Sequence, residues 1–298
     1  MTISASMVKE LREKTGVGMM ECKKALEENQ GDLEKAILWL RERGLSRAAK
    51  KADRVASEGV VKVLVSEDQR SGVVIELNAE TDFASKNAEF IKFADDLAKL
   101  ALQNKVGDLD ALNSLKMGSD TVDNNLKGLI AKIGENMRVR RVALLTTNKG
   151  TVAGYTHMGG KIGSLILLNG AEGPEVQELG KDLAMHAAAA APRYLKSDEV
   201  SPEEIETEKD LGRKALLEQG KPENMHEKIL QGQINKFFKE ICLTEQAFIK
   251  DPSTTVSKLV AEKGKGATLS SFHLFKLGEG IDKKKENFAD EVAAALRS

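Results

Sequence analysis

The chain has 298 residues, 41% of them hydrophobic and 31% charged, a balance that fits a globular protein of two or three domains. A disordered chain is excluded, because it needs fewer apolar residues and a larger net charge. Lys and Arg total 45 against 46 Asp and Glu, whereas a protein held chiefly on nucleic acid or an anionic membrane carries a basic excess. We therefore expect neither a membrane nor a direct nucleic-acid partner.

Signals for export or membrane insertion are not seen in the sequence. No apolar run reaches the roughly 20 residues that a membrane span needs. The first residues form neither a basic region nor an apolar one. The two cysteines, Cys22 and Cys242, lie far apart in the chain, which favours reduced thiols. We expect a cytoplasmic protein.

Residues 1–52 are predicted to form a small bundle of three helices. The first helix ends at Gly16, which readily adopts the left-handed conformation, and the second follows Gly18. Asp32 caps a third helix, which we expect Gly44 to close. The basic run after it is typical of a linker.

Residues 53–148 change from the helical to the strand pattern. β-rich runs at 60–65 and 73–77, joined by a polar turn, predict a β-hairpin. A helix follows, with apolar residues along one side between 90 and 100, and after further helical sequence residues 139–145 form another strand. This order predicts a first α+β subdomain with a small antiparallel sheet.

The same order recurs in residues 149–298. A second hairpin is predicted from 151–157 and 162–168, then a helix from about 175 to 190, and finally the strand 271–277. We therefore predict an α+β protein with two similar subdomains, each with a small antiparallel sheet covered by helices.

A charged helical hairpin is predicted at about residues 200–240, within the second subdomain. Pro202 begins its first helix, and the turn at 220–222 leads into the second. Such an antiparallel pair buries one stripe and exposes the other, so it projects readily from a core. A last short helix is expected at 287–296.

Candidate catalytic and ligand motifs fail on spacing. The glycine-rich run 154–164 resembles a phosphate-binding loop, but Lys161 is followed by Ile162 instead of Ser or Thr. The run also joins two strands, whereas a phosphate loop opens a helix. The histidines have no ligand-like spacing to one another or to the cysteines. We predict no enzyme activity, no metal site and no cofactor.

The connection Thr81-Asp82-Phe83-Ala84, between a buried strand and a helix, holds an acid beside a large aromatic residue. Either Asp82 caps the next helix and Phe83 packs beneath it, or Phe83 is a wedge presented to a partner. Met19 and Met20 could likewise belong to the core of the bundle or to a surface that contacts a partner. Adjacent helical positions cannot both face the centre of one core, and methionine is common at adaptable binding surfaces.

Several motifs together resemble the bacterial translation elongation factor Ts family, in order and spacing along the whole chain. They are LREKTGVGMMECKKAL at 11–26, ELNAETDFASK at 76–86, KIGEN at 132–136 with Arg140 and Arg141, YTH at 155–157, MHA at 185–187, and GEGI at 278–281. The chain departs from the family at Ala79, where Cys is frequent, and at Ala84, where Val is usual. Residues 244–250 are also less typical, which leaves their partner contacts open.

The resemblance implies a guanine-nucleotide exchange factor that serves the GTPase elongation factor Tu during translation elongation and is not an enzyme. It implies that the N-terminal helices form a ubiquitin-associated-like domain that docks on the partner. The implied contact residues are Arg12, Met19, Met20, Lys23, Ile133, Gly134 and His157. Thr81 to Ala84 would act near the partner's Mg²⁺, dislodging Mg²⁺ and GDP so that GTP enters. The helical hairpin implies a route to a homodimer.

Two other functions stay open from the residues alone. In the first, the N-terminal bundle recruits a partner passively and the rest of the chain is a scaffold without exchange activity. In the second, the basic runs at 47–51 and 138–141 bind RNA as part of a ribosomal accessory protein, although the near-neutral net charge argues against this.

Overall fold

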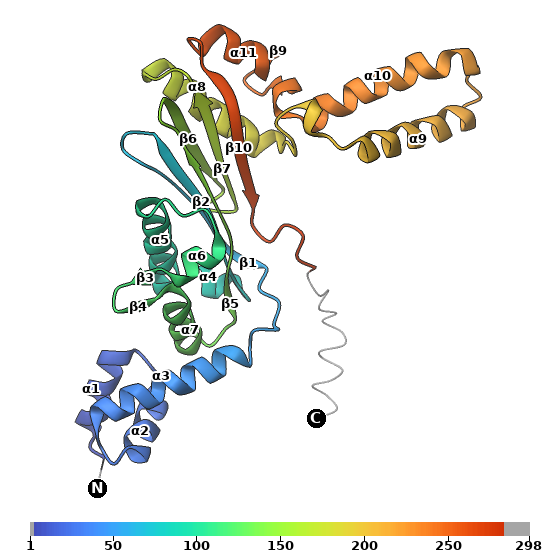
Figure 1. Ribbon diagram of the computed structural model, residues 1–298. Helices are drawn as coiled ribbons and strands as arrows, with labels where there is room; N and C mark the ends of the chain where they lie inside the picture. The colour runs from blue at the N-terminus through green and yellow to red at the C-terminus, as the bar shows by residue number, and fades with distance from the viewer. Residues whose placement is uncertain (1–2, 283–298) are drawn as a thin grey trace.

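The computed structural model describes residues 3–282, and the helix expected at 287–296 lies outside them. At the N-terminus, three helices enclose a small apolar core (Figure 1). They are α1 (Ala5–Thr15), α2 (Met19–Glu28) and α3 (Leu33–Ala49). Gly16 ends α1 with φ 67°, and the Asp32 side chain accepts the Lys35 N–H at the start of α3, so both predicted helix boundaries are confirmed.

The prediction that Gly44 closes the third helix is wrong, because α3 continues to Ala49. A Cβ atom at Gly44 would lie 2.9 Å from the Cβ atom of Ala131. Glycine therefore lets α3 pack closely against a helix of the next region. The long third helix fastens the bundle to the rest of the molecule.

The first sheet has three antiparallel strands in the order β1-β2-β5. Its strands are β1 (Glu58–Val65), β2 (Ser71–Ala79) and β5 (Met137–Thr146). Between β2 and β5 lie α4 (Asp82–Ser85), α5 (Ala88–Gln103), α6 (Leu109–Ser114), the strand pair β3 (Lys116–Met117) and β4 (Asp120–Thr121), and α7 (Val122–Ile133). The apolar side of α5 packs on this sheet, as its sequence pattern predicts.

The second sheet repeats this arrangement in the order β10-β7-β6. Its strands are β6 (Gly150–His157), β7 (Ile162–Asn169) and β10 (Thr268–Lys276). Helix α8 (Pro174–Ala190) covers it, and β8 (Ala247–Phe248), β9 (Asp251–Thr255) and α11 (Val256–Lys263) pack nearby (Figure 1). The predicted pair of similar α+β units is therefore confirmed.

The two sheets face each other, which the sequence pattern did not predict. Their inner faces share one apolar cluster, to which both sheets contribute Val and Leu side chains. Glycines in the facing strands permit the close approach: a Cβ atom at Gly163 would lie 2.6 Å from Val61 Cγ1, and one at Gly154 would lie 2.5 Å from Val63 Cγ1. Strand β2 is buried at every position, between α5 and the second sheet.

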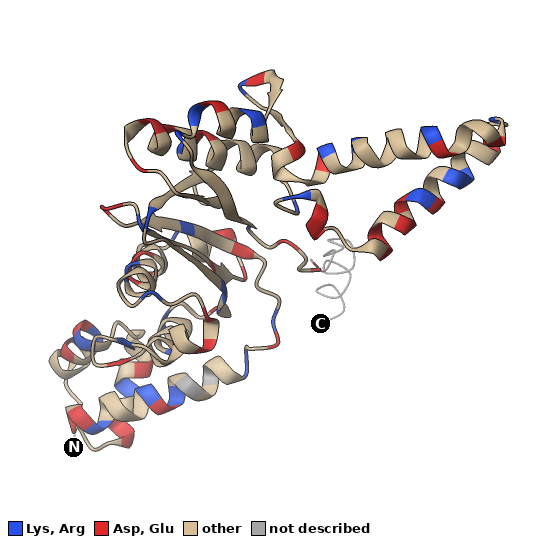
Figure 2. Ribbon diagram, turned by 45° about the horizontal axis from the view of Figure 1, so that its top comes forward, with Lys and Arg blue, Asp and Glu red and all other residues tan. Residues whose placement is uncertain are grey.

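A helical hairpin of α9 (Pro202–Glu218) and α10 (Glu223–Ile241) projects from the second half, as predicted (Figure 1). Figure 2 shows both signs of charge along its two helices. Leu216, Leu230 and Ile234 are buried, whereas Leu211 and Leu217 are exposed. Within residues 3–282, none of the helices has the length and hydropathy required to cross a membrane.

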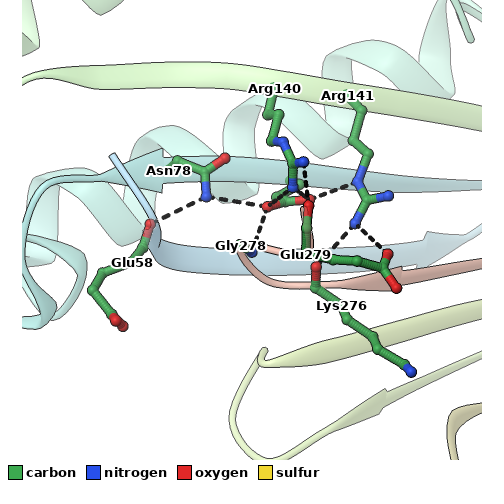
Figure 3. A network of polar contacts seen from close by, with 8 residues as sticks. Glu58, Asn78, Arg140, Arg141, Lys276, Gly278 and Glu279 are labelled. Atoms are coloured by element: carbon green, nitrogen blue, oxygen red, sulfur yellow. Dashed lines mark hydrogen bonds and ion pairs between the residues drawn. The ribbon is translucent and has the colours of Figure 1, made fainter. Parts of the chain in front are cut away.

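A buried ion cluster joins the first sheet to the segment after β10. The Glu76 carboxylate accepts hydrogen bonds from the Gly278 amide at 2.8 Å, Arg141 Nε at 2.6 Å and Arg140 Nη1 at 3.0 Å. Consecutive strand residues normally point to opposite faces, but a β-bulge at Arg140 lets both arginines reach one carboxylate. Figure 3 shows both side chains converging beside Gly278 and Glu279.

Candidate functional site

The short connection after β2 forms a rigid corner, residues 81–84, that consists of one turn of helix with a defined cap. The Thr81 hydroxyl accepts the Ala84 N–H at 3.2 Å, so Thr81 caps α4. The expectation that Asp82 caps the following helix is wrong, since Asn87 caps α5 and Asp82 is the first residue of α4. Asp82 pairs with Lys86 at 2.7 Å, and this hydrogen bond lowers the pKa of the Asp82 carboxyl.

Phe83 points out of this corner. Its side chain is 81% exposed, so the hypothesis that it packs beneath the helix is wrong. The next residue, Ala84, is buried and anchors the corner on the core. A large aromatic side chain this exposed gains little from the folded chain alone, which makes it a candidate for burial in a partner.

A second corner, where α7 ends and β5 begins, lies beside the first. Gly134 ends α7 with φ 89°, a conformation that favours glycine. Glu135 follows and accepts the Thr81 N–H at 3.0 Å and the Thr81 hydroxyl at 2.8 Å. The structure therefore brings the predicted residues Ile133 and Gly134, the former half-buried and the latter exposed, next to residues 81–84.

The turn between β6 and β7 reaches the same end of the two sheets. The Gly160 carbonyl accepts the Val61 N–H at 2.7 Å, and Lys161 pairs with Glu58 at 2.9 Å. Glu58 is in turn the strand partner of Ala79, which lies just before residues 81–84, the Phe83 corner. His157, at the end of β6, is exposed, and its Nδ1 lies 3.0 Å from the Tyr155 hydroxyl.

The predicted contact residues of the N-terminal bundle lie on its surface. Arg12, Met19, Met20 and Lys23 are all exposed, Met20 at 78%. The bundle core contains Leu11, Cys22 and Leu26 instead. The bundle is held near the Phe83 corner, because α3 packs against α7 and Lys51 donates a hydrogen bond to the Gly134 carbonyl.

The surroundings of the Phe83 corner offer little for covalent chemistry. In the described part of the chain, no cluster of three His, Cys, Asp or Glu side chains could hold a metal ion. The glycine-rich run at 154–164 joins β6 to β7, as predicted, and opens no helix. What the corner offers instead is the exposed Phe83 ring on a fixed backbone, which suits contact with another protein.

Comparison with known proteins agrees with this arrangement. A family model described as elongation factor TS matches residues 80–279, which include the Phe83 corner, the α7–β5 corner and the hairpin. Elongation factor Ts of Syntrophotalea carbinolica is 51% identical over 305 aligned residues, covering 100% of both chains. Elongation factor Ts of Clostridium botulinum strain Eklund 17B is 49% identical over 300 residues, with 99% of both chains covered.

The chain belongs to the elongation factor Ts family. It is therefore a nucleotide exchange factor for elongation factor Tu in translation elongation and not an enzyme. Membership of this family decides between exchange and passive recruitment, a choice that the residues alone left open.

In this elongation factor Ts, sequence patterns predicted several side chains that the structure exposes, but not the residues that hold them in place. Glu80, Glu135 and Asn136 lie in the motifs at 76–86 and 132–136, yet the sequence pattern gives them no role. The only sequence signal for this support is an acid beside each corner, Glu80 and Glu135. Their hydrogen bonds join positions more than fifty residues apart, so they follow from the tertiary structure alone.

Proposed function

We propose that residues Thr81 to Ala84 perform the exchange, with Phe83 entering elongation factor Tu and dislodging Mg²⁺ and GDP so that GTP enters. The observation that supports this most is the 81% exposed Phe83 ring on a corner whose base is buried at Ala84 and bonded at Thr81. A ring fixed in this way meets a partner without first reorganising, which lowers the cost of binding.

The energetics favour such a wedge. Burying a phenylalanine side chain contributes roughly 1.5–3 kcal/mol. A bound nucleotide is held by its phosphate-binding loop and by Mg²⁺, which neutralises the phosphate charge. If Phe83 is buried fully only when the partner has lost Mg²⁺ and GDP, the factor weakens GDP binding. By linkage, GDP weakens binding of the factor to the same extent.

The remaining surfaces fit a division of labour along the chain. Residues 1–52 form the docking bundle, which uses the exposed Arg12, Met19, Met20 and Lys23. Residues 53–148 carry Phe83 together with Ile133 and Gly134. Residues 149–298 add a separate contact through His157. The exposed positions of these side chains support this assignment, except that Ile133 is half-buried and contributes from the edge of its corner.

The helical hairpin supports a further proposal, that two copies of the chain associate through α9 and α10. Leu211 is 56% exposed and Leu217 64% exposed, so the hairpin has apolar side chains on its surface that a second copy could bury. Analytical ultracentrifugation of the chain and of a Leu211→Asp/Leu217→Asp variant tests this. A monomer at all concentrations of the unaltered chain contradicts the proposal.

Release of a fluorescent GDP from elongation factor Tu tests the wedge, because its Mg²⁺ dependence is specific. At millimolar Mg²⁺ the unaltered chain should accelerate release far more than Phe83→Ala does. In excess EDTA the two should converge, since the chelator has already removed the ion that Phe83 dislodges. If Phe83→Ala slows GDP release by the same factor with and without Mg²⁺, then Phe83 does not act by dislodging Mg²⁺.

A further inference from the structure

We propose that Glu135 is a positioning residue for Phe83, working with Glu80 and Asn136 as a brace that ties the Phe83 corner to the linker of the N-terminal bundle. This inference rests on the proposed function of Phe83 and adds the residues that hold its corner in place.

The first half of the brace is the grip of Glu135 on Thr81. One carboxylate oxygen accepts the Thr81 N–H at 3.0 Å, and the other accepts the Thr81 hydroxyl at 2.8 Å. Both bonds go to a carboxylate, and such charge-assisted bonds are stronger than neutral ones. Because Thr81 caps α4, this grip sets the position from which the helix starts.

In the second half of the brace, the acceptor lies beside the Phe83 corner and the donor lies at the α7–β5 corner. The Glu80 carboxylate accepts the Asn136 N–H at 2.5 Å, so adjacent residues of each corner bind the other corner. Asn136 is buried, and its side-chain Nδ2 donates to the Arg54 carbonyl at 2.7 Å and to the Ala52 carbonyl at 3.3 Å. The Arg54 guanidinium also forms an ion pair with the Glu80 carboxylate, at 3.6 Å. The linker from the bundle is thereby bonded to Asn136 and Glu80, and Glu80 directly precedes the Phe83 corner.

Such a brace matters because α4 cannot hold its own position. A helix of four residues is far too short to be stable alone. The exposed Phe83 ring has few contacts to orient it, so the backbone of α4 decides where the ring points. A binding group must be held within a fraction of an ångström by its supporting residues to act efficiently. Glu135 supplies that support from the neighbouring α7–β5 corner.

Glu135→Ala separates positioning from affinity. In GDP release from elongation factor Tu, we expect the maximal rate at saturating factor to fall about threefold to tenfold, because Phe83 enters less often in the right orientation. The concentration for half-maximal release should change much less, since the bundle still docks. Glu135→Gln keeps one acceptor oxygen and should give an intermediate rate.

Glu172→Ala is the matched control. Glu172 also accepts a backbone N–H, from Gly150 at 3.2 Å, and pairs with an arginine, Arg70, at 3.1 Å, but it lies after β7 in the second half. It should leave the maximal rate unchanged. Amide hydrogen exchange of residues 79–86 should rise in Glu135→Ala and stay unchanged in Glu172→Ala. An unchanged maximal rate in Glu135→Ala, or an equal loss in both variants, overturns the proposal.

The double variant Phe83→Ala/Glu135→Ala distinguishes failure of this inference from failure of the proposed function. If Glu135 acts through Phe83, removing it from a chain that already lacks the ring should cost nothing further. Full additivity of the two losses overturns the positioning role while leaving Phe83 as the wedge. A Phe83→Ala chain with unaltered release overturns the proposed function itself.

Discussion

The two α+β halves of the molecule have the same strand topology and different connections. In each, the second strand of a hairpin is central and a later strand closes the sheet on its other side, giving the orders β1-β2-β5 and β10-β7-β6. Each closing pair also contains an irregularity of register, at Glu76/Leu77 and at Leu269/Ser271. The scaffold is therefore repeated.

The difference lies between the central strand and the helix that covers it. After β2 the chain makes the capped turn α4 and exposes Phe83 before α5 begins. After β7 it passes through Gly170 and Gly173, both with positive φ, directly into α8. The two halves thus share a scaffold, and they differ in the short braced corner to which we assign the exchange function.

The halves also differ in their buried polar groups, and the largest expected effect follows from this. Glu76 of the first half is fully buried and paired with two arginines, so Glu76→Ala leaves both arginines without their shared partner. We expect the free energy of unfolding to fall by about 3–5 kcal/mol. Urea denaturation measures it. The exposed Glu279, 3.4 Å from Arg141, is the control, and Glu279→Ala should cost about 1 kcal/mol or less.

Phe83→Ala tests whether the corner makes the two halves functionally unequal. Maximal GDP release should fall about tenfold to a hundredfold, or about 1.4–2.8 kcal/mol, while the Tm of the free protein stays unchanged because the ring is exposed. Leu211→Ala removes an apolar side chain that is 56% exposed from the second half, away from the proposed contacts with elongation factor Tu, and should leave release intact. A large fall in Tm for Phe83→Ala would place the ring in the core.

Asp82→Ala should act in the same direction and more weakly. Asp82 does not cap α4, and its ion pair with Lys86 is exposed and therefore weak, so we expect a loss in maximal release of about threefold or less. Asp123→Ala is matched to it, since Asp123 also lies in the first turn of a helix and pairs with a lysine four residues later. Equal losses in both variants would show that Asp82 has no special role.

The smallest expected effect is a difference between the two halves in the pH at which each loses stability. Burial lowers the pKa of His186, and its hydrogen bond with Gln246 opposes this only in part, so the second half loses stability as the pH falls below about 6.5. Burial works to raise the pKa of Glu76, but the Gly278 amide and the arginines hold it below its usual range. The first half therefore weakens only below about pH 4.3.

Hydrogen exchange at about pH 5.5 and pH 7.5 checks this order. The amide of Ile249 donates to His186 Nδ1 at 3.2 Å and should lose protection first, whereas the amides of β2 should keep theirs. In a His186→Gln chain the difference between the two pH values should shrink. Equal loss of protection in both halves contradicts the assignment to His186.

The sequence by itself determined the elements and their order, because helix and strand periods are local properties of the chain. The two hairpins, the helix with Phe90 to Leu100 on one side, and the projecting pair after Pro202 were all predicted correctly. The motifs at 11–26 and 76–86 also carried the family resemblance. Local patterns did not reveal that Gly44 lies inside a helix, since its reason is the neighbouring Ala131.

Only the tertiary structure decided which side chains are buried together and which are exposed. An aromatic residue after a strand is compatible with core and wedge alike, and the exposure of Phe83 follows from what lies around its corner. Glu76 meets Gly278 across 202 residues of sequence, and Glu135 meets Thr81 across 54. Such contacts depend on how sheets and corners come together in space, which no local period encodes.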